Sequence, residues 1–377
     1  MTNGDVAIQF IKTEKELKTV CESLKTRSAI GFDTEFDRFR REYGFKLSLL
    51  QVYDGEVCYI IDPLSIPDLS LLWPVFENPE IQKVAYSCSE DIQILKVNGC
   101  LPKNIYDIQI VAKLCNHPSN SYSDVLRDEL GIILDKSLQK SNWRKRPLEE
   151  AQLLYASNDV IPLLKLKDIF SAVAEKNGVS AFIDEDNAAC EAIPVVDFTV
   201  KLTPRQKGSY SSYHQKTLLN LFLLRNEIAK EYNMPPANIC SDTVLEDVIE
   251  NRKAFMLAPF SRGFCKRLFE DEANRKKFTA FIETIDPAMP VRSERERVPY
   301  DATTPRIPFE RAEKVPDMKY ILLSDYVTER YGKIAAEYIL RGFKKTIGSR
   351  NGATSGLRDY QKKLIKEACK ELDVVFK

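Results

Sequence analysis

Residues 28–36 read Ser-Ala-Ile-Gly-Phe-Asp-Thr-Glu-Phe, a β-rich apolar run that ends in two acidic residues. Short runs of this kind predict strands. Three more occur, at 47–52, 57–61 and 83–86. Helical periodicity is found at 14–25, 91–97, 105–115 and 149–176. Pro162 is expected to kink the last of these helices or split it in two. Strands interleaved with helices predict an α/β fold with a mixed sheet and flanking helices.

The composition is that of a globular protein. The chain has 377 residues, of which 44% are apolar and 29% are charged, so two or three domains are expected and a mostly disordered chain is not. No apolar run reaches the roughly 18–20 residues of a membrane helix, and residues 1–5 do not resemble the start of a secretion signal. Nine cysteines without a Cys-x-x-Cys pair indicate reduced thiols and a cytoplasmic location.

The net charge of zero hides an asymmetry along the chain. Residues 1–190 hold 22 Lys+Arg and 29 Asp+Glu, whereas residues 191–377 hold 33 and 26. This division suggests that one part holds cations and the other meets a polyanion, although drift in surface charge would give the same pattern. The domains expected are an α/β domain at 1–190, a linker at 191–208, a helical domain at 209–288, a proline-rich linker at 289–318 and a helical segment at 319–377.

Four acidic residues occupy positions that an α/β fold of this kind would bring close together. Asp33 and Glu35 are two residues apart at the end of a strand, so their side chains point to one face. Asp91 follows the strand at 83–86, at the expected start of a helix. Asp159 lies four residues after Tyr155 in a predicted helix, which puts the carboxylate and the phenol on the same face.

Convergence of these carboxylates would require a compensating charge. Two carboxylates about 4 Å apart repel by roughly 4 kcal/mol at an effective dielectric constant of about 20. Divalent cations with oxygen ligands remove that repulsion, and two such ions about 3.5–4 Å apart form a clamp for attack on a phosphodiester. Only two histidines exist, His117 and His214, which argues against a histidine-rich zinc site or a Ser-His-Asp triad.

Each of these residues also has an ordinary structural explanation when taken singly. An Asp-x-Glu pair at a strand end can shape a turn, and Asp91 can cap a helix. Tyr155 can pack in the core of an amphipathic helix, and Asp159 can face solvent. The functional interpretation therefore depends on the set of residues and on their order along the chain.

Three stretches resemble the exonuclease motifs of ribonuclease D, in the DEDD superfamily of 3′–5′ exonucleases. They are Phe32–Phe36, Tyr86–Asp91 and Tyr155–Val160. Connecting stretches match as well, at Tyr106–Gln109, Leu134–Ser137, Trp143 and Arg146–Leu148. The resemblance covers roughly residues 5–180. It implies a ribonuclease H-like sheet and two metal ions, Mg²⁺ or Mn²⁺, held by Asp33, Glu35, Asp91 and Asp159. Tyr155, where another branch uses histidine, would position or help activate the attacking water.

The sequence departs from this family at one place in the second motif. Relatives often carry His-Ala-Gly before Ser-Glu-Asp, and here the residues are Tyr86-Ser87-Cys88. All four acids remain, so the departure concerns substrate contacts near Tyr86. Further candidates for contact with nucleic acid are Trp143, Arg144 and Arg146, although a charge run of this kind can equally form a solvated face.

Residues 210–288 resemble the HRDC domain, a small helical bundle that accompanies ribonuclease D and some helicases. The resemblance lies in Leu221–Ala229, Asn233–Pro236 and Ser241-Asp242 and implies nucleic-acid binding. Cations and aromatic residues mix at 260–269, as in surfaces that bind single strands, or else the aromatic residues form a core. The segment 319–377 is interpreted as a possible diverged second bundle of this type.

The sequence therefore predicts a metal-dependent 3′–5′ exoribonuclease. Its expected substrate is RNA with a free 3′ end, such as a tRNA precursor, from which mononucleotides are removed. No membrane association is expected, and no protein partner can be inferred. The alternatives are an exonuclease of the same chemistry that acts on DNA, and a non-catalytic RNA-binding adaptor that keeps the fold.

Overall fold

The computed structural model describes residues 6–251, 271–292, 318–346 and 356–375. These residues form two compact units. The first, here called the α/β unit, contains the described residues 6–36, 47–196, 318–346 and 356–375. The second, the helical unit, contains the described residues 37–46, 197–251 and 271–292. Most of the expected linker at 289–318 lies outside the described residues, as do the cations and aromatic residues Phe260, Arg262, Phe264, Lys266, Arg267 and Phe269.

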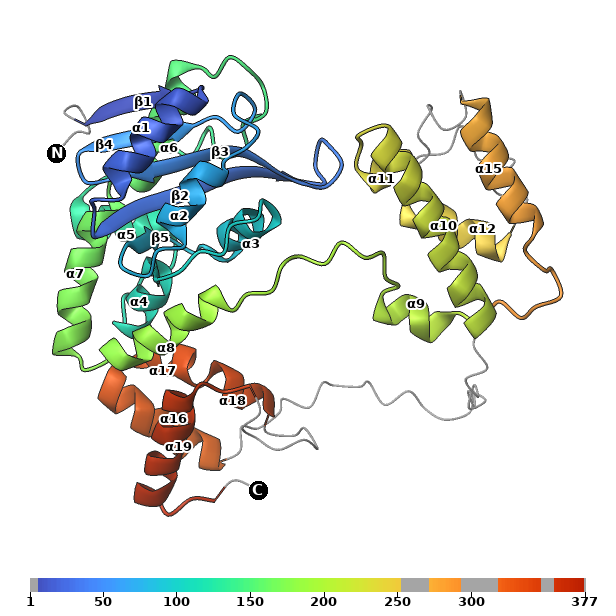
Figure 1. Ribbon diagram of the computed structural model, residues 1–377. Helices are drawn as coiled ribbons and strands as arrows, with labels where there is room; N and C mark the ends of the chain where they lie inside the picture. The colour runs from blue at the N-terminus through green and yellow to red at the C-terminus, as the bar shows by residue number, and fades with distance from the viewer. Residues whose placement is uncertain (1–5, 252–270, 293–317, 347–355, 376–377) are drawn as a thin grey trace. The chain divides into compact units, whose positions relative to one another are not determined.

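A six-stranded mixed sheet forms the centre of the α/β unit (Figure 1). Its strands are β1 (Ala7–Ile11), β2 (Ala29–Arg38), β3 (Phe45–Tyr53), β4 (Val57–Ile61), β5 (Gln82–Ala85) and β6 (Ile105–Asp107). They lie in the order β1-β4-β3-β2-β5-β6, with β3 antiparallel to β4 and with β1–β4, β2–β5 and β5–β6 parallel. Strand β2, which carries the first acidic motif, is therefore central.

The helices of the α/β unit follow the expected alternation with strands. They are α1 (Glu14–Leu24), the 3₁₀ turn η1 (Ser70–Leu72), α2 (Trp73–Phe76), α3 (Ser89–Val97), α4 (Ile108–Leu114), α5 (Tyr122–Leu130), α6 (Glu150–Val160), α7 (Leu163–Lys176) and α8 (Ser180–Glu191). The predicted break at Pro162 is confirmed, because that residue separates α6 from α7. One prediction is wrong: Ile105–Asp107 forms strand β6 and not the start of a helix, since a three-residue apolar run has no period that distinguishes the two.

Helices near the C-terminus belong to the α/β unit. They are α16 (Met318–Tyr331), α17 (Lys333–Ile339), α18 (Arg341–Thr346) and α19 (Asp359–Glu371). Helix α17 packs against α4, and α19 packs against α8 (Figure 1). Leu323, Ile339 and Phe343 are buried in the same apolar cluster as Leu49 and Val84 of the sheet. The sequence analysis predicts a separate helical segment at 319–377. In the structure these helices are part of the α/β unit, because α4 and α8 cover the apolar faces of α17 and α19.

The helical unit has a core of its own. Its helices are α9 (Pro204–Ser209), α10 (Ser212–Glu231), α11 (Pro236–Ile239), α12 (Asp242–Glu250) and α15 (Glu272–Glu283). Leu218, Phe222, Leu245 and Phe278 meet in one buried cluster. Thr203 begins α9 with a capping box, so the last part of the expected linker 191–208 is helical.

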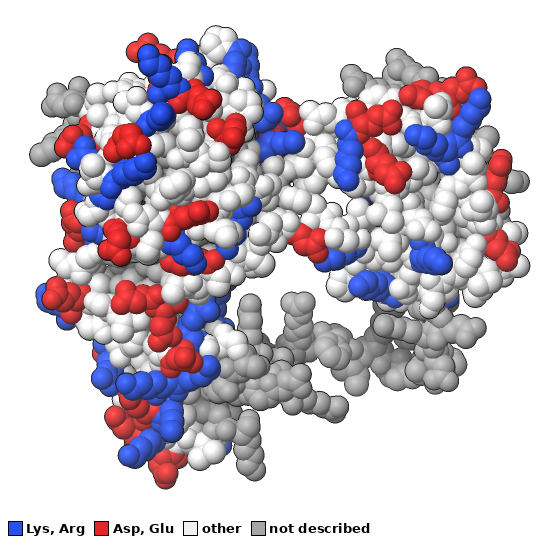
Figure 2. Space-filling model, in the orientation of Figure 1, with Lys and Arg blue, Asp and Glu red and all other residues white. Residues whose placement is uncertain are grey.

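Charges of both signs cover the visible surface. Figure 2 shows Lys and Arg interspersed with Asp and Glu on the visible face of each unit. Among the described helices, none combines the length and hydropathy that a membrane span requires.

Candidate active site

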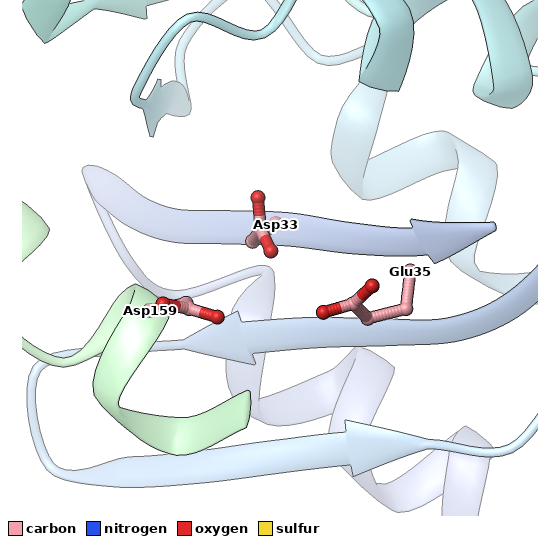
Figure 3. A group of neighbouring side chains, drawn as sticks. All are labelled: Asp33, Glu35 and Asp159. Atoms are coloured by element: carbon pink, nitrogen blue, oxygen red, sulfur yellow. The ribbon is translucent and has the colours of Figure 1, made fainter. Parts of the chain in front are cut away.

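Three carboxylates meet at the centre of the sheet. Asp33 and Glu35 project from β2, and Asp159 comes from α6 (Figure 3). One oxygen of each lies within 4.8 Å of the other two. All three side chains are half-buried, so the cluster is open to a ligand on one side.

A glycine brings α6 close to β2. A Cβ atom built on Gly31 would lie 2.9 Å from the backbone carbonyl oxygen of Val160 and 3.4 Å from the Cβ of Leu163. Only a residue without a side chain leaves room for the end of α6 at this distance. Asp159, the neighbour of Val160, is thereby placed opposite the acids of β2.

Asp91 completes the acidic set from a different direction. It lies in the first turn of α3, is 8% exposed and accepts a hydrogen bond from the Thr34 hydroxyl. It is not one of the three residues whose oxygens lie within 4.8 Å of one another. Its charge nevertheless acts on the pKa of Asp33 and of Glu35, so the four predicted acids share one electrostatic environment.

Burial and mutual repulsion raise the pKa values of these acids. For Asp33 burial has the largest effect on the pKa, followed by the charges of Asp91, Asp159 and Glu35. Burial also raises the pKa of Glu35 well above its ordinary value, and it raises that of Asp159 to about 7. Burial raises the pKa of Asp91 to about 6, although the bond from Thr34 opposes this shift. A bound cation would favour the ionised forms and relieve the repulsion.

Tyr155 lies one turn before Asp159 on α6, as predicted. It is half-buried, and its ring centre is 5.8 Å from that of Trp143. Burial raises the pKa of its phenol, and the charges of Asp159, Glu35 and Asp33 add to the shift. The phenol therefore keeps its proton at neutral pH and is suited to donate a hydrogen bond.

A cavity of about 460 Å³ opens over the acidic cluster. It is lined by all four acids and Tyr155, together with Thr34, Phe36, Tyr86, Ser87, Glu90, Ser121, Tyr122, Ser123, Leu134, Lys136 and Gln139. Among these lining residues Lys136 is the one Lys or Arg, and it is exposed. The cavity thus combines oxygen ligands for a cation with aromatic rings and a single positive charge.

The residues predicted to contact nucleic acid occupy different environments. Tyr86 lines the cavity, with its hydroxyl donating to the carbonyl of Asn120 and its ring centre 5.0 Å from that of Tyr122. Trp143 is only 4% exposed and belongs to the core. Arg144 donates to the carbonyl of Leu47, 3.3 Å away.

Arg146 has a structural role instead of the predicted one. Its Nε and one Nη donate to the two carboxylate oxygens of Asp62 at 2.9 and 2.7 Å. Its remaining donors reach the carbonyls of Ser48, Trp143 and Lys145. A guanidinium has five N–H donors, so none is left for a phosphate unless one of these bonds breaks. The structure does not support Arg146 or the buried Trp143 as contacts for nucleic acid.

Sequence reasoning missed two residues that support the site. Tyr122 donates from its hydroxyl to the backbone carbonyl of Asp159, 3.0 Å away, and so holds the end of α6. Asp107 accepts hydrogen bonds from the backbone that leads into α3. Asp107 lies within one of the connecting stretches that resemble ribonuclease D, so that stretch was an available signal, whereas Tyr122 lies outside these stretches and had none.

Comparisons with known proteins agree with this geometry. Residues 8–175 match a family described as 3′–5′ exonuclease. Ribonuclease D of Shewanella sp. (strain ANA-3) is 39% identical over 160 residues, covering 42% of this chain and 41% of the relative. Ribonuclease D of Escherichia coli (strain K12) is 38% identical over 180 residues, covering 47% and 48%. The aligned part is thus less than half the length of these two curated relatives.

Solved structures show the same fold. The crystal structure of Escherichia coli RNase D superposes with a TM-score of 0.64 at 24% identity, covering 97% of this chain and 99% of that chain. The catalytic core of RRP6 from Trypanosoma brucei superposes with a TM-score of 0.63 at 20% identity, covering 75% and 80%. The expected ribonuclease H-like sheet, followed by helical regions, is confirmed. Residues 8–175 therefore match a 3′–5′ exonuclease family and are similar to part of ribonuclease D.

Proposed function

We propose that this protein is a cytoplasmic, metal-dependent 3′–5′ exoribonuclease that removes mononucleotides from RNA. The observation that carries the proposal is the convergence of Asp33, Glu35, Asp91 and Asp159 beside Tyr155 in one open cavity. Its similarity to ribonuclease D supports RNA as the substrate. The Escherichia coli enzyme is described as an exoribonuclease involved in structured RNA processing, which favours structured RNA such as tRNA precursors here.

The four acids are proposed to hold two divalent cations, Mg²⁺ or Mn²⁺. They fit such ions because all their donors are oxygen atoms and because their raised pKa values mark a site with excess negative charge. When bound, the cations would polarise the scissile phosphodiester and stabilise the charge that develops on the leaving oxygen.

Three side chains around the acids are assigned to the substrate. Tyr155 donates a hydrogen bond that orients the attacking water or a phosphate oxygen, since its phenol stays protonated. Lys136 is placed to neutralise a phosphate of the incoming strand. Tyr86 offers a ring against which a base can stack, in the position where relatives often carry histidine.

A digestion assay tests the proposal directly. RNA labelled at its 5′ end should be shortened in single-nucleotide steps with Mg²⁺ and remain intact with EDTA. The Asp33→Asn variant should lose at least about 10³-fold in rate, since a metal ligand contributes several kcal/mol to the transition state. Asp168→Asn is the control, because Asp168 is exposed on α7 and forms an ion pair with Lys167 at the surface. Hydrolysis at the normal rate by Asp33→Asn would disprove the assignment.

Two further comparisons in that assay separate the alternatives. Equal or faster digestion of a DNA strand of the same sequence would make the protein a DNA exonuclease, because the 2′-OH is the chemical difference. Binding without any cleavage would make it an adaptor. Tyr155→Phe should lower turnover by roughly 10²–10⁴, the usual contribution of a positioned proton donor or acceptor.

The helical unit is proposed to be an HRDC-type RNA-binding domain. Helix α15 exposes Arg275, Lys276 and Lys277 in succession, and Lys276 pairs with Glu272. The double substitution Arg275→Glu and Lys277→Glu should weaken RNA binding and make its salt dependence shallower. The slope of log affinity against log salt concentration should fall by about 0.7 for each phosphate that is no longer neutralised. The same affinity and slope in variant and unaltered protein would assign RNA binding elsewhere.

A further inference from the structure

The backbone that leads into α3 is strained and is not capped by its own side chains. Ser87, between β5 and α3, has a φ of +59°. This left-handed conformation costs a residue with a side chain about 1–2 kcal/mol. Cys88 is the N-cap of α3 and makes no side-chain capping bond. Because Asp91 lies in the first turn of α3, a loose start to this helix would shift the backbone of Asp91 and leave the hydrogen bond from Thr34 to hold its carboxylate.

Asp107 fixes this backbone from the neighbouring strand. One of its carboxylate oxygens accepts from the amide of Ser87 at 2.8 Å, and the other accepts from the amide of Cys88 at 3.0 Å. The Cys88 thiol lies 3.6 Å from the second oxygen. Asp107 is 3% exposed, so water cannot easily replace these bonds if the carboxylate is removed.

Asp107 is itself held in place from two sides. It is the N-cap of α4, and the oxygen that accepts from Ser87 also accepts from the amide of Gln109 at 2.9 Å. Its own backbone amide donates to the side-chain oxygen of Asn187 on α8, 3.1 Å away. One buried carboxylate therefore joins the starts of two helices at the end of β6.

We propose that Asp107 is a positioning residue for the metal site, which holds Asp91 in place through the backbone of Ser87 and Cys88. This inference rests on the proposed function, since it assumes that Asp91 binds a cation. The carboxylate is needed because both of its oxygens act as acceptors. An amide of the same shape would turn its NH₂ group toward at least one of these N–H donors, so that bond would be replaced by a repulsive contact.

The Asp107→Asn variant of the full chain tests the proposal. Mn²⁺ would be titrated into the protein, and the free ion would be followed by its EPR signal, without substrate or turnover. The affinity of at least one Mn²⁺ should fall by roughly 10–100-fold, the usual cost of losing a residue that orients a metal ligand. Exonuclease activity should recover partly as the Mn²⁺ concentration is raised, which a simple loss of fold would not allow.

Asp186→Asn is the matched control. Asp186 is also a buried acid of the α/β unit, but its carboxylate bonds to Arg358 and Tyr360 and not to Ser87 or Cys88. This variant should bind Mn²⁺ as tightly as the unaltered protein. Equal Mn²⁺ affinity in Asp107→Asn and the unaltered protein would overturn the proposal, and so would an equal loss in both variants.

A second variant covers the case in which Asp107→Asn does not fold. Asn187→Ala removes only the hydrogen bond to the backbone of Asp107, so Mn²⁺ affinity should fall by a smaller factor, up to about tenfold. Unchanged affinity in a folded Asn187→Ala protein would then contradict the proposal. If the unaltered protein itself binds no Mn²⁺, the proposed function fails, which is a different result from equal binding by variant and parent.

Discussion

Two helical regions follow the first 191 residues of the chain, and each packs into a different hydrophobic core. Helix α15 buries Phe278 among residues of α10 and α12 in the helical unit. Helices α16–α19 bury Phe343 against the α/β unit, in the cluster that contains Leu49 and Val84 of the sheet. In sequence both regions are short amphipathic helices, so pattern alone does not separate them.

An amphipathic helix thus belongs to the domain whose residues cover its apolar face. An amphipathic helix needs a partner, and the helix itself does not specify which one. Here α4 and α8 of the α/β unit cover the apolar faces of α17 and α19. The C-terminal helices are therefore part of the folding unit that carries the acids.

Removal of residues 318–377 should prevent the α/β unit from folding. The truncation removes the buried side chains of Leu323, Ile339 and Leu364 and exposes the apolar surface that they cover, and the burial of each is worth about 1.5–3 kcal/mol. Their sum approaches the stability of a whole domain, about 5–15 kcal/mol. Near-ultraviolet circular dichroism and exonuclease activity measure the result. A truncated protein with full activity and an unchanged melting curve would show that the C-terminal helices are dispensable.

A pair of Phe→Ala substitutions compares the two cores directly. Phe343 is 1% exposed and Phe278 is 0% exposed, so each change should cost about 3–5 kcal/mol. Phe343→Ala should lower the temperature at which exonuclease activity disappears, whereas Phe278→Ala should destabilise only the helical unit. Calorimetry combined with residual activity after heating distinguishes them. Equal loss of activity on heating in both variants would mean that the two units unfold together.

A pair of Tyr→Phe substitutions makes the same comparison through hydrogen bonds. Tyr360 on α19 donates to the buried Asp186 of α8 at 2.8 Å, and Phe at this position should cost about 1–3 kcal/mol by leaving that acceptor unpaired. Tyr232 of the helical unit donates to Asp271 at 2.6 Å near the surface, where water can replace the hydroxyl. When urea unfolding is monitored by exonuclease activity, the midpoint should move to a lower urea concentration for Tyr360→Phe and stay unchanged for Tyr232→Phe.

The smallest expected effect concerns helix capping. Asn116, which follows α4, accepts from the amide of Ile334 at 2.8 Å and so caps α17. Asn116→Ala should cost about 1 kcal/mol of the free energy of unfolding of the α/β unit. Ser211→Ala, which removes the cap of α10, should have a similar cost in the helical unit. Thermal melting monitored by exonuclease activity should shift for Asn116→Ala alone.

The sequence was informative where chemistry and spacing coincide in one short stretch. The pair Asp33 and Glu35 needs only the two-residue period of a strand, and Tyr155 and Asp159 need only one helical turn. The break at Pro162 follows from the missing N–H of proline. These features are local, and the structure confirms that Tyr155 and Asp159 share α6 and that Asp33 and Glu35 share one strand. The prediction that the two acids end that strand is wrong, because β2 continues to Arg38.

Features that depend on contacts between distant segments could not be read in this way. Arg146 looked like a phosphate ligand because its partner, Asp62, lies 84 residues earlier. Asp107 looked like one residue of a matching stretch, although its carboxylate reaches back about 20 residues to Ser87 and Cys88. Phe343 is buried in one cluster with Leu49 and Val84, which lie far earlier in the chain. A pattern of residue types carries no information on such pairings.

Gly31 has no side chain, and this allows α6 to lie close to β2 beside the acidic cluster. The carbonyl oxygen of Val160 lies 2.9 Å from the position that a Cβ atom on Gly31 would occupy, and Asp159 precedes Val160 on the same turn of α6. An alanine at position 31 would push that turn outward and lengthen the span between ligands, without changing any ligand. The spacing of the carboxylates that are proposed to hold cations therefore depends on a residue that is not one of the proposed ligands.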